Sequence, residues 1–121
     1  MTPEAEPTED LLTRRRAETI RRIEALTGQF DVMVEASELS TNDDEHDPEG
    51  ATVAFERAQV QSMLREAQEE LAELGRAADR LREGTYGFCE RCGNPIAPER
   101  LAALPATRTC ISCANKSRRW A

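Results

Sequence analysis

Four cysteines are the residues of this chain best suited to specific chemistry. They form two pairs, Cys89–Cys92 and Cys110–Cys113, each with two residues between its members, and seventeen residues separate the pairs. Two intervening residues let one tight turn direct both sulfurs at the same metal ion, and Gly93 supplies the backbone freedom that such a turn needs. Two pairs complete a tetrahedral shell of thiolates with no open position. The spacing therefore predicts one structural Zn²⁺ ion, because a catalytic zinc keeps a place for water.

Two other uses of paired cysteines are disulfide bonds and a thioredoxin-like redox pair. Disulfides are rare in a reducing cytosol, where we expect this chain, because it has no long apolar stretch that could span a membrane and its first ten residues are acidic rather than signal-like. A thioredoxin-like redox pair usually occurs next to a βαβ unit, which the sequence does not indicate. The sole histidine, His46, lies more than forty residues from the cysteines and is not a ligand candidate.

The composition favours helices over a thick globular core. Of the residues, 39% are hydrophobic, only 4% are aromatic and 32% are charged, a balance typical of a solvent-exposed helical structure. The C-terminal segment, residues 84–121, is too short to bury much apolar surface. Metal binding must therefore supply a large share of its folding free energy.

Two long segments show helical periodicity. Residues 9–39 contain no proline, and their apolar positions step by three and four: Ile20, Ile23, Leu26, Phe30 and Met33. Residues 48–83 carry a heptad seam: Val60, Leu64, Ala67, Leu71, Leu74, Ala78 and Leu81. The run Asp47-Pro48-Glu49 is typical of a helix start, and Gly84 is a natural stop.

The polar segment between these helices has nothing to bury, so it predicts a connection. We therefore expect a mainly α fold, in which a long antiparallel helical hairpin (a coiled coil) precedes a small four-cysteine zinc finger with a short terminal helix. The predicted divisions are a disordered lead-in over 1–8, the hairpin over 9–83 with its tip at 40–50, and the finger over 84–121. A single long helix that dimerises through its seam is the alternative, which Asp47-Pro48 disfavours.

Charge is distributed unevenly along the chain. Overall, 16 Lys and Arg stand against 23 Asp and Glu, a net charge of −7. Residues 1–83 hold ten basic and twenty-one acidic side chains, net −11, whereas residues 84–121 hold six and two, net +4. An acidic chain repels the phosphate backbone, so direct sequence-specific DNA binding is not expected. A basic protein partner, or a basic channel in one, is the better match.

The cysteine pairs stand within a longer motif. It begins as G-F-C-E-R-C-G-N-P-I over 87–96, continues as R-L-A-A-L-P over 100–105 and ends as C-I-S-C over 110–113. This pattern, C-x2-C-G-x2-I-x3-R-L-x-A-x-P-x4-C-I-x-C, resembles that of the DksA/TraR family of RNA-polymerase-binding transcription factors. The preceding hairpin has the family's size. The resemblance covers about residues 10–120 and is most specific over 84–113.

The resemblance implies a regulator that binds RNA polymerase and has no enzymatic activity. Family members insert the coiled coil into the polymerase secondary channel, so that an acidic tip lies near the active centre and modulates initiation. The family's tip motif, D-x-x-D-x-A, falls on 46–51, where Glu49 replaces the second Asp, Ala51 matches and His46 replaces the first Asp. The implied tip residues are Asp44, Glu45, His46, Asp47, Glu49 and Ala51.

The resemblance also bears on two further contacts. It implies that the basic C-terminal residues Lys116, Arg118 and Arg119 touch the outer rim of the channel, on a short helix whose alternative is a frayed terminus. Family members that respond to guanosine tetraphosphate present basic residues to it at positions that correspond here to Glu66, Glu73 and Ala114. Acidic side chains repel phosphates, so cooperation with this nucleotide by the family's route is not expected.

Two other functions remain open from the residues. One is a zinc-finger adaptor whose coiled coil binds a different protein, without polymerase contact. The other is a nucleic-acid-binding zinc ribbon, which only the net charge of +4 over 84–121 favours. An enzyme is not expected, because the sequence offers no nucleophile–base pair and no glycine-rich phosphate loop.

Overall fold

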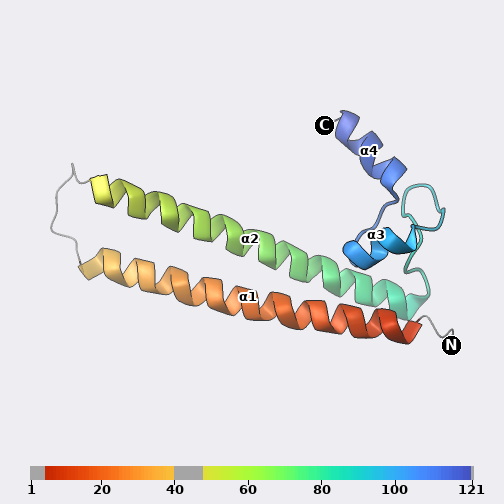
Figure 1. Ribbon diagram of the computed structural model, residues 1–121, viewed down its shortest axis with the longest axis horizontal. Helices are drawn as coiled ribbons and strands as arrows, with labels where there is room; N and C mark the ends of the chain where they lie inside the picture. The colour runs from red at the N-terminus through yellow and green to blue at the C-terminus, as the bar shows by residue number, and fades with distance from the viewer. Residues whose placement is uncertain (1–4, 40–47, 121) are drawn as a thin grey trace. The chain divides into compact units, whose positions relative to one another are not determined.

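In the part of the chain that the structure describes, two long helices are followed by two short ones (Figure 1). The computed structural model describes residues 5–39 and 48–120. Helices α1 (Ala5–Leu39) and α2 (Pro48–Glu83) form an antiparallel hairpin, and α3 (Pro98–Ala103) and α4 (Ile111–Trp120) belong to the C-terminal segment. The predicted mainly α fold, with its hairpin and short terminal helix, is confirmed. In the described ranges no helix is long and apolar enough to cross a membrane.

The contacts divide the chain into two compact units. The finger unit comprises residues 1–17 and 70–121, and the hairpin unit comprises residues 18–69. Each unit contains its own stretch of both long helices and its own apolar clusters. The C-terminal segment therefore packs as one body with the end of the hairpin beside it. Helix α1 already begins at Ala5, four residues before the start that the sequence predicts.

The hairpin unit is held together by the predicted apolar seams. Leu26 on α1 is buried with Val60 and Ala67 on α2. Four partly buried side chains pack against this cluster: Ile23, Phe30, Met33 and Leu64. Burial of such side chains contributes about 1.5–3 kcal/mol each when complete, so this thin double layer is the main source of stability in the unit.

One residue of the apolar series predicted over 9–39, Ile20, is not buried. The side chain of Ile20 is 41% exposed, whereas its neighbour Thr19 is only 5% exposed. The buried positions of α1 follow steps of seven, from Leu12 through Thr19 to Leu26, and Ile20 lies about 100° away from that line. A search for apolar residues alone passes over the polar member of the series.

In the finger unit, residues that follow α2 pack against the two long helices. Leu12 of α1 is buried with Leu74 and Ala77 of α2, and Tyr86 and Ala106 from beyond α2 pack on the same cluster. Ala77 is fully buried, whereas the predicted seam residue at position 78 is only partly buried. The apolar stripe of α2 is wider here because the helix is covered on two sides.

Gly84 ends α2 as predicted, through a left-handed turn. Its φ angle is +81°, a conformation that costs L side chains free energy because of the Cβ atom. The Gly84 N–H donates to the Leu81 carbonyl (3.3 Å), and the Thr85 N–H donates to the Arg80 carbonyl (2.9 Å). These two bonds form a Schellman motif, which satisfies carbonyls at the end of α2 and redirects the chain toward the first cysteine pair.

Leu74 provides a test of the finger unit's core. Its side chain is 2% exposed, so Leu74→Ala should lower the free energy of unfolding by about 2 kcal/mol or more. Urea denaturation followed by circular dichroism measures the change. The matched control is Leu104→Ala, because Leu104 is 52% exposed and should shift the value by less than about 0.5 kcal/mol. Equal effects of the two substitutions would contradict the assigned core.

Candidate metal centre

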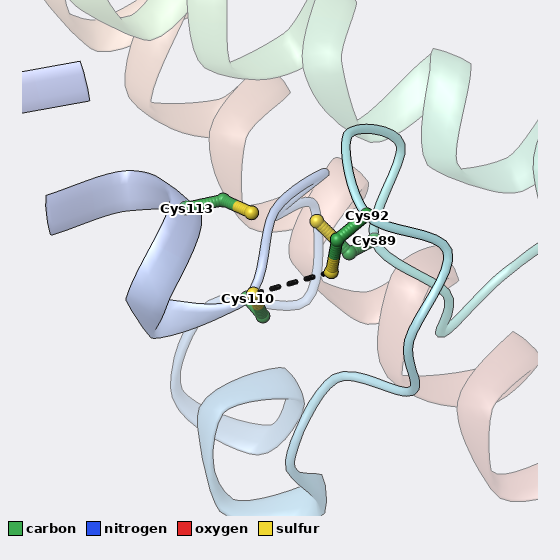
Figure 2. Close-up of side chains that lie close together, drawn as sticks. All are labelled: Cys89, Cys92, Cys110 and Cys113. Carbon is green, nitrogen blue, oxygen red and sulfur yellow. Dashed lines mark hydrogen bonds between the residues drawn. The ribbon is translucent and has the colours of Figure 1, made fainter. Parts of the chain in front are cut away.

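The first cysteine pair lies on a tight hairpin turn stabilised by backbone hydrogen bonds. The Cys89 N–H donates to the Asn94 carbonyl (2.8 Å), and the Gly93 N–H donates to the Cys89 carbonyl (2.9 Å). Gly93 has a φ of +77°, which explains why glycine follows the second cysteine. Phe88 and Pro95, which flank the turn, form a single antiparallel β-bridge. The turn thus presents the sulfurs of Cys89 and Cys92 on the same side (Figure 2).

The second cysteine pair lies at the beginning of α4. Cys110 directly precedes the helix, and the Ala114 N–H donates to the Cys110 carbonyl (3.0 Å), as the first intrahelical bond. Cys110 is therefore in the N-cap position and Cys113 lies in the first turn. The free backbone N–H groups of a helix start favour negative charge, so a thiolate is stabilised there.

The four sulfurs converge on one point (Figure 2). Their Sγ atoms all lie within 4.8 Å of one another, and the Cys92–Cys110 separation is 3.8 Å. A regular tetrahedron with Zn–S bonds of about 2.3 Å has edges of about 3.8 Å, so the spacing fits zinc. A disulfide needs sulfurs about 2.05 Å apart, and all four cysteines are free of disulfide bonds in this arrangement. The chain holds one structural Zn²⁺ ion through these four thiolates.

Hydrogen bonding and crowding act on the thiols in opposite directions. Backbone N–H groups, first that of Cys110 and then that of Cys92, lower the pKa of Cys89 to about 6. The N–H of Cys113 likewise lowers the pKa of Cys110. By contrast, the neighbouring sulfur of Cys110, together with burial, raises the pKa of Cys113 to about 12. Four thiolates this close repel one another, and a divalent cation removes that repulsion.

Apolar packing and one arginine support the metal centre. Cys89, Ile96 and Cys113 form a small buried cluster, with Leu101 of α3 and Cys110 packed against it. The Arg100 Nε donates to the Thr109 carbonyl (2.9 Å), and its Nη2 donates to the Thr107 hydroxyl (3.3 Å). Arg100 thereby fixes the backbone that leads into Cys110.

Helix α3 is not among the predicted elements, although the sequence carries a signal for it. Pro98 occupies the first helical turn and Glu99 follows it, a combination typical of helix starts. At its end, the Leu104 N–H donates to the Arg100 carbonyl (2.7 Å). The helix is short because Pro105 follows closely.

The other predicted site residues are spread over the chain. Asp44, Glu45, His46 and Asp47 lie outside the described residues, and their assignment to the tip stays a prediction. Glu49 and Ala51 are in the first turns of α2, with Ala51 exposed. Lys116 is exposed on α4, and Arg118 and Arg119 lie in its last turn.

The residues at the predicted nucleotide positions, two glutamates and an alanine, supply no basic side chain for phosphate groups. Glu66 is exposed, and Glu73 lies close to both Arg76 and Arg108. Glu73 and Ala114 line an open cavity of about 750 Å³ in the finger unit, whose charged lining consists of three arginines and three glutamates. The acidic groups offset the positive potential that would attract phosphates.

The finger matches a known family model. Residues 84–119 match the prokaryotic dksA/traR C4-type zinc finger. Among solved structures, the DnaK suppressor protein from Agrobacterium tumefaciens C58 is 30% identical with a TM-score of 0.55, and the match covers 96% of both chains. The chain belongs to the DksA/TraR family. Transcription factor DksA2 from Pseudomonas aeruginosa is 28% identical with a TM-score of 0.77, over 95% of this chain and 83% of that one.

Curated relatives share only part of their length with this family member. General stress protein 16O of Bacillus subtilis is 36% identical over 77 residues, which are 64% of this chain and 47% of that protein. An uncharacterized protein of Aquifex aeolicus is 47% identical over 49 residues, 40% of this chain and 34% of that protein. The chain thus spans less than half the length of either relative.

Replacement of one ligand tests the metal centre. Cys113→Ser should reduce bound zinc well below one ion per chain and unfold α3 and α4, because the finger has little other core. Zinc content by atomic emission and helicity by circular dichroism measure these effects. The control is Ser112→Ala, an exposed neighbour that should keep full zinc content. Retention of one tightly bound ion by Cys113→Ser would contradict the four-thiolate site.

Proposed function

We propose that this family member is a transcription regulator that binds RNA polymerase. In this proposal the end of its hairpin that joins α1 to α2 enters the secondary channel, where the acidic tip modulates initiation. The zinc ion has no part in a reaction. It folds the finger, which packs against the end of the hairpin opposite the connection between α1 and α2.

Family membership is the observation that carries this proposal. The P. aeruginosa relative of similar fold is a transcription factor by name, and it aligns over 95% of this chain. The proposal extends that role here, together with the family's route through the secondary channel. It assigns no catalytic residue.

The distribution of charge supports the proposed mode of binding. The hairpin unit has four basic and thirteen acidic side chains, a net charge of −9, whereas the finger unit has twelve and ten, net +2. The acidic charge is thus concentrated on the unit that would enter a positively charged channel, and it would accelerate entry. At 36 residues, α2 is about 54 Å long, sufficient to reach into a deep channel.

Co-purification with core RNA polymerase tests the proposal. The zinc-loaded chain should be retained with the enzyme, and it should compete with cleavage factors that also use the secondary channel. Retention should weaken with added salt, because the attraction is largely electrostatic. If the chain neither co-purifies nor competes, the zinc-finger adaptor that binds another protein becomes the better interpretation.

Glu49 provides a test of the tip. Glu49→Ala should leave the affinity for polymerase nearly unchanged and weaken the effect on transcription, because the residue would act on the active centre rather than anchor the complex. Binding assays and in vitro transcription measure the two properties separately. The matched control is Glu56→Ala, an exposed acid two turns further along α2. Loss of binding in Glu49→Ala alone would assign Glu49 to the docked interface instead.

Guanosine tetraphosphate is not expected to cooperate with this chain by the family's route. The expectation rests on Glu66 and Glu73, which stand where responsive members have basic residues. Adding the nucleotide to the in vitro transcription assays tests this expectation, because the effect of the parent chain on transcription should stay the same.

A further inference from the structure

A continuous series of ion pairs joins α2 to both halves of the zinc finger. Arg108, in the segment before Cys110, has its Nε 3.4 Å from Oε2 of Glu73 on α2 and its Nη1 4.0 Å from Oε2 of Glu90. Arg80 of α2 has its Nη1 3.8 Å from Oε1 of Glu90. The series Glu73–Arg108–Glu90–Arg80, called the ion-pair network below, therefore begins and ends on α2.

Main-chain hydrogen bonds accompany the ion-pair network. The Glu90 N–H donates to the Arg108 carbonyl (2.9 Å), which joins the first cysteine pair to the segment before the second. The Arg80 guanidinium donates to the Ala106 carbonyl (3.5 Å) in that same segment. Glu90 follows Cys89 directly, so one member of the network is the next residue to a metal ligand.

The network is too exposed to decide whether the chain folds. The side chains of Arg108, Glu90 and Glu73 are 49%, 46% and 30% exposed, whereas that of Arg80 is 13% exposed. Each of the three ion pairs therefore has at least one partner that is 30% exposed or more. Ion pairs of this exposure contribute little to global stability, and salt screens them. The zinc ion and the apolar clusters hold the fold, and the network can shift only the balance between closely related arrangements of the finger on α2.

We propose that the ion-pair network is a salt-sensitive set of contacts that holds the two halves of the finger, the first cysteine pair and the segment 105–109 before the second pair, against each other and against α2. Arg108 is its positioning residue. At low ionic strength Arg108 holds the segment 105–109 against Glu73 and Glu90. At high ionic strength that segment opens more often, while the zinc ion stays bound. The inference concerns the free chain, and only its use in presenting the finger to polymerase rests on the proposed function.

Amide hydrogen exchange of Glu90, measured by NMR on the zinc-loaded chain, tests this inference. The Glu90 N–H spans the two halves of the finger, whereas the Gly93 N–H bonds within one turn to Cys89 and serves as the internal reference. The ratio of their protection factors should fall as salt rises from about 0.05 M to about 1 M. Arg108→Gln should lower the ratio about three- to fivefold at low salt and remove its salt response.

Two variants separate the network from a general effect of charge. Asp79→Asn breaks an exposed ion pair with Arg82 that lies wholly within α2, and it should leave the ratio unchanged. Arg108→Lys keeps the positive charge and should restore most of the protection. Zinc content is measured on the same samples, so that ligand loss is recognised.

Several results would overturn the inference. They are an unchanged ratio in Arg108→Gln, an equal fall in Asp79→Asn, or a salt response that persists without Arg108. If Arg108→Gln loses zinc, Glu73→Gln takes its place, because Glu73 lies on α2 away from the ligands. It should lower the ratio about twofold, and no change there would also overturn the inference. None of these measurements includes polymerase, so they can fail independently of the proposed function.

Discussion

The bonding of four thiolates to one zinc ion is the constraint on which the finger unit depends. Its buried cluster beyond α2 contains two of the ligands themselves, so the metal and the core are the same structure. The sulfurs can approach to 3.8 Å only if their charge is neutralised, and that requirement links folding to metal binding. The Schellman turn at Gly84 and the helix start at Cys110 then position the two cysteine pairs that bind the ion.

From this centre the structure extends to the hairpin through α2. Tyr86, just beyond the end of α2, donates its hydroxyl proton to the Pro105 carbonyl (2.8 Å) and packs on the cluster around Leu74. Burial raises the pKa of Tyr86, although the positive charge of Arg80 works against that rise. The hydroxyl therefore stays a proton donor at neutral pH. The finger and its end of the hairpin form one unit because they share this core.

Much of the fold was predictable because its signals are local in sequence. Heptad spacing in α2, the start at Pro48, the stop at Gly84 and the paired cysteines each depend on residues a few positions apart. The contacts of Arg80, Glu90 and Arg108 are different, because charged surface residues follow no period and their partners lie 10 to 35 positions away. The burial of Ala77 was hidden for a similar reason, since a third element covers it.

Thr19 has a consequence for how the two long helices align. It is a polar residue, 5% exposed, in a seam otherwise made of apolar side chains. In coiled coils a single polar residue of this kind makes its layer differ from the apolar layers on either side, at some cost in buried apolar area. The series Leu12, Thr19 and Leu26 is therefore not uniform along α1, and a shift of one heptad would not reproduce it.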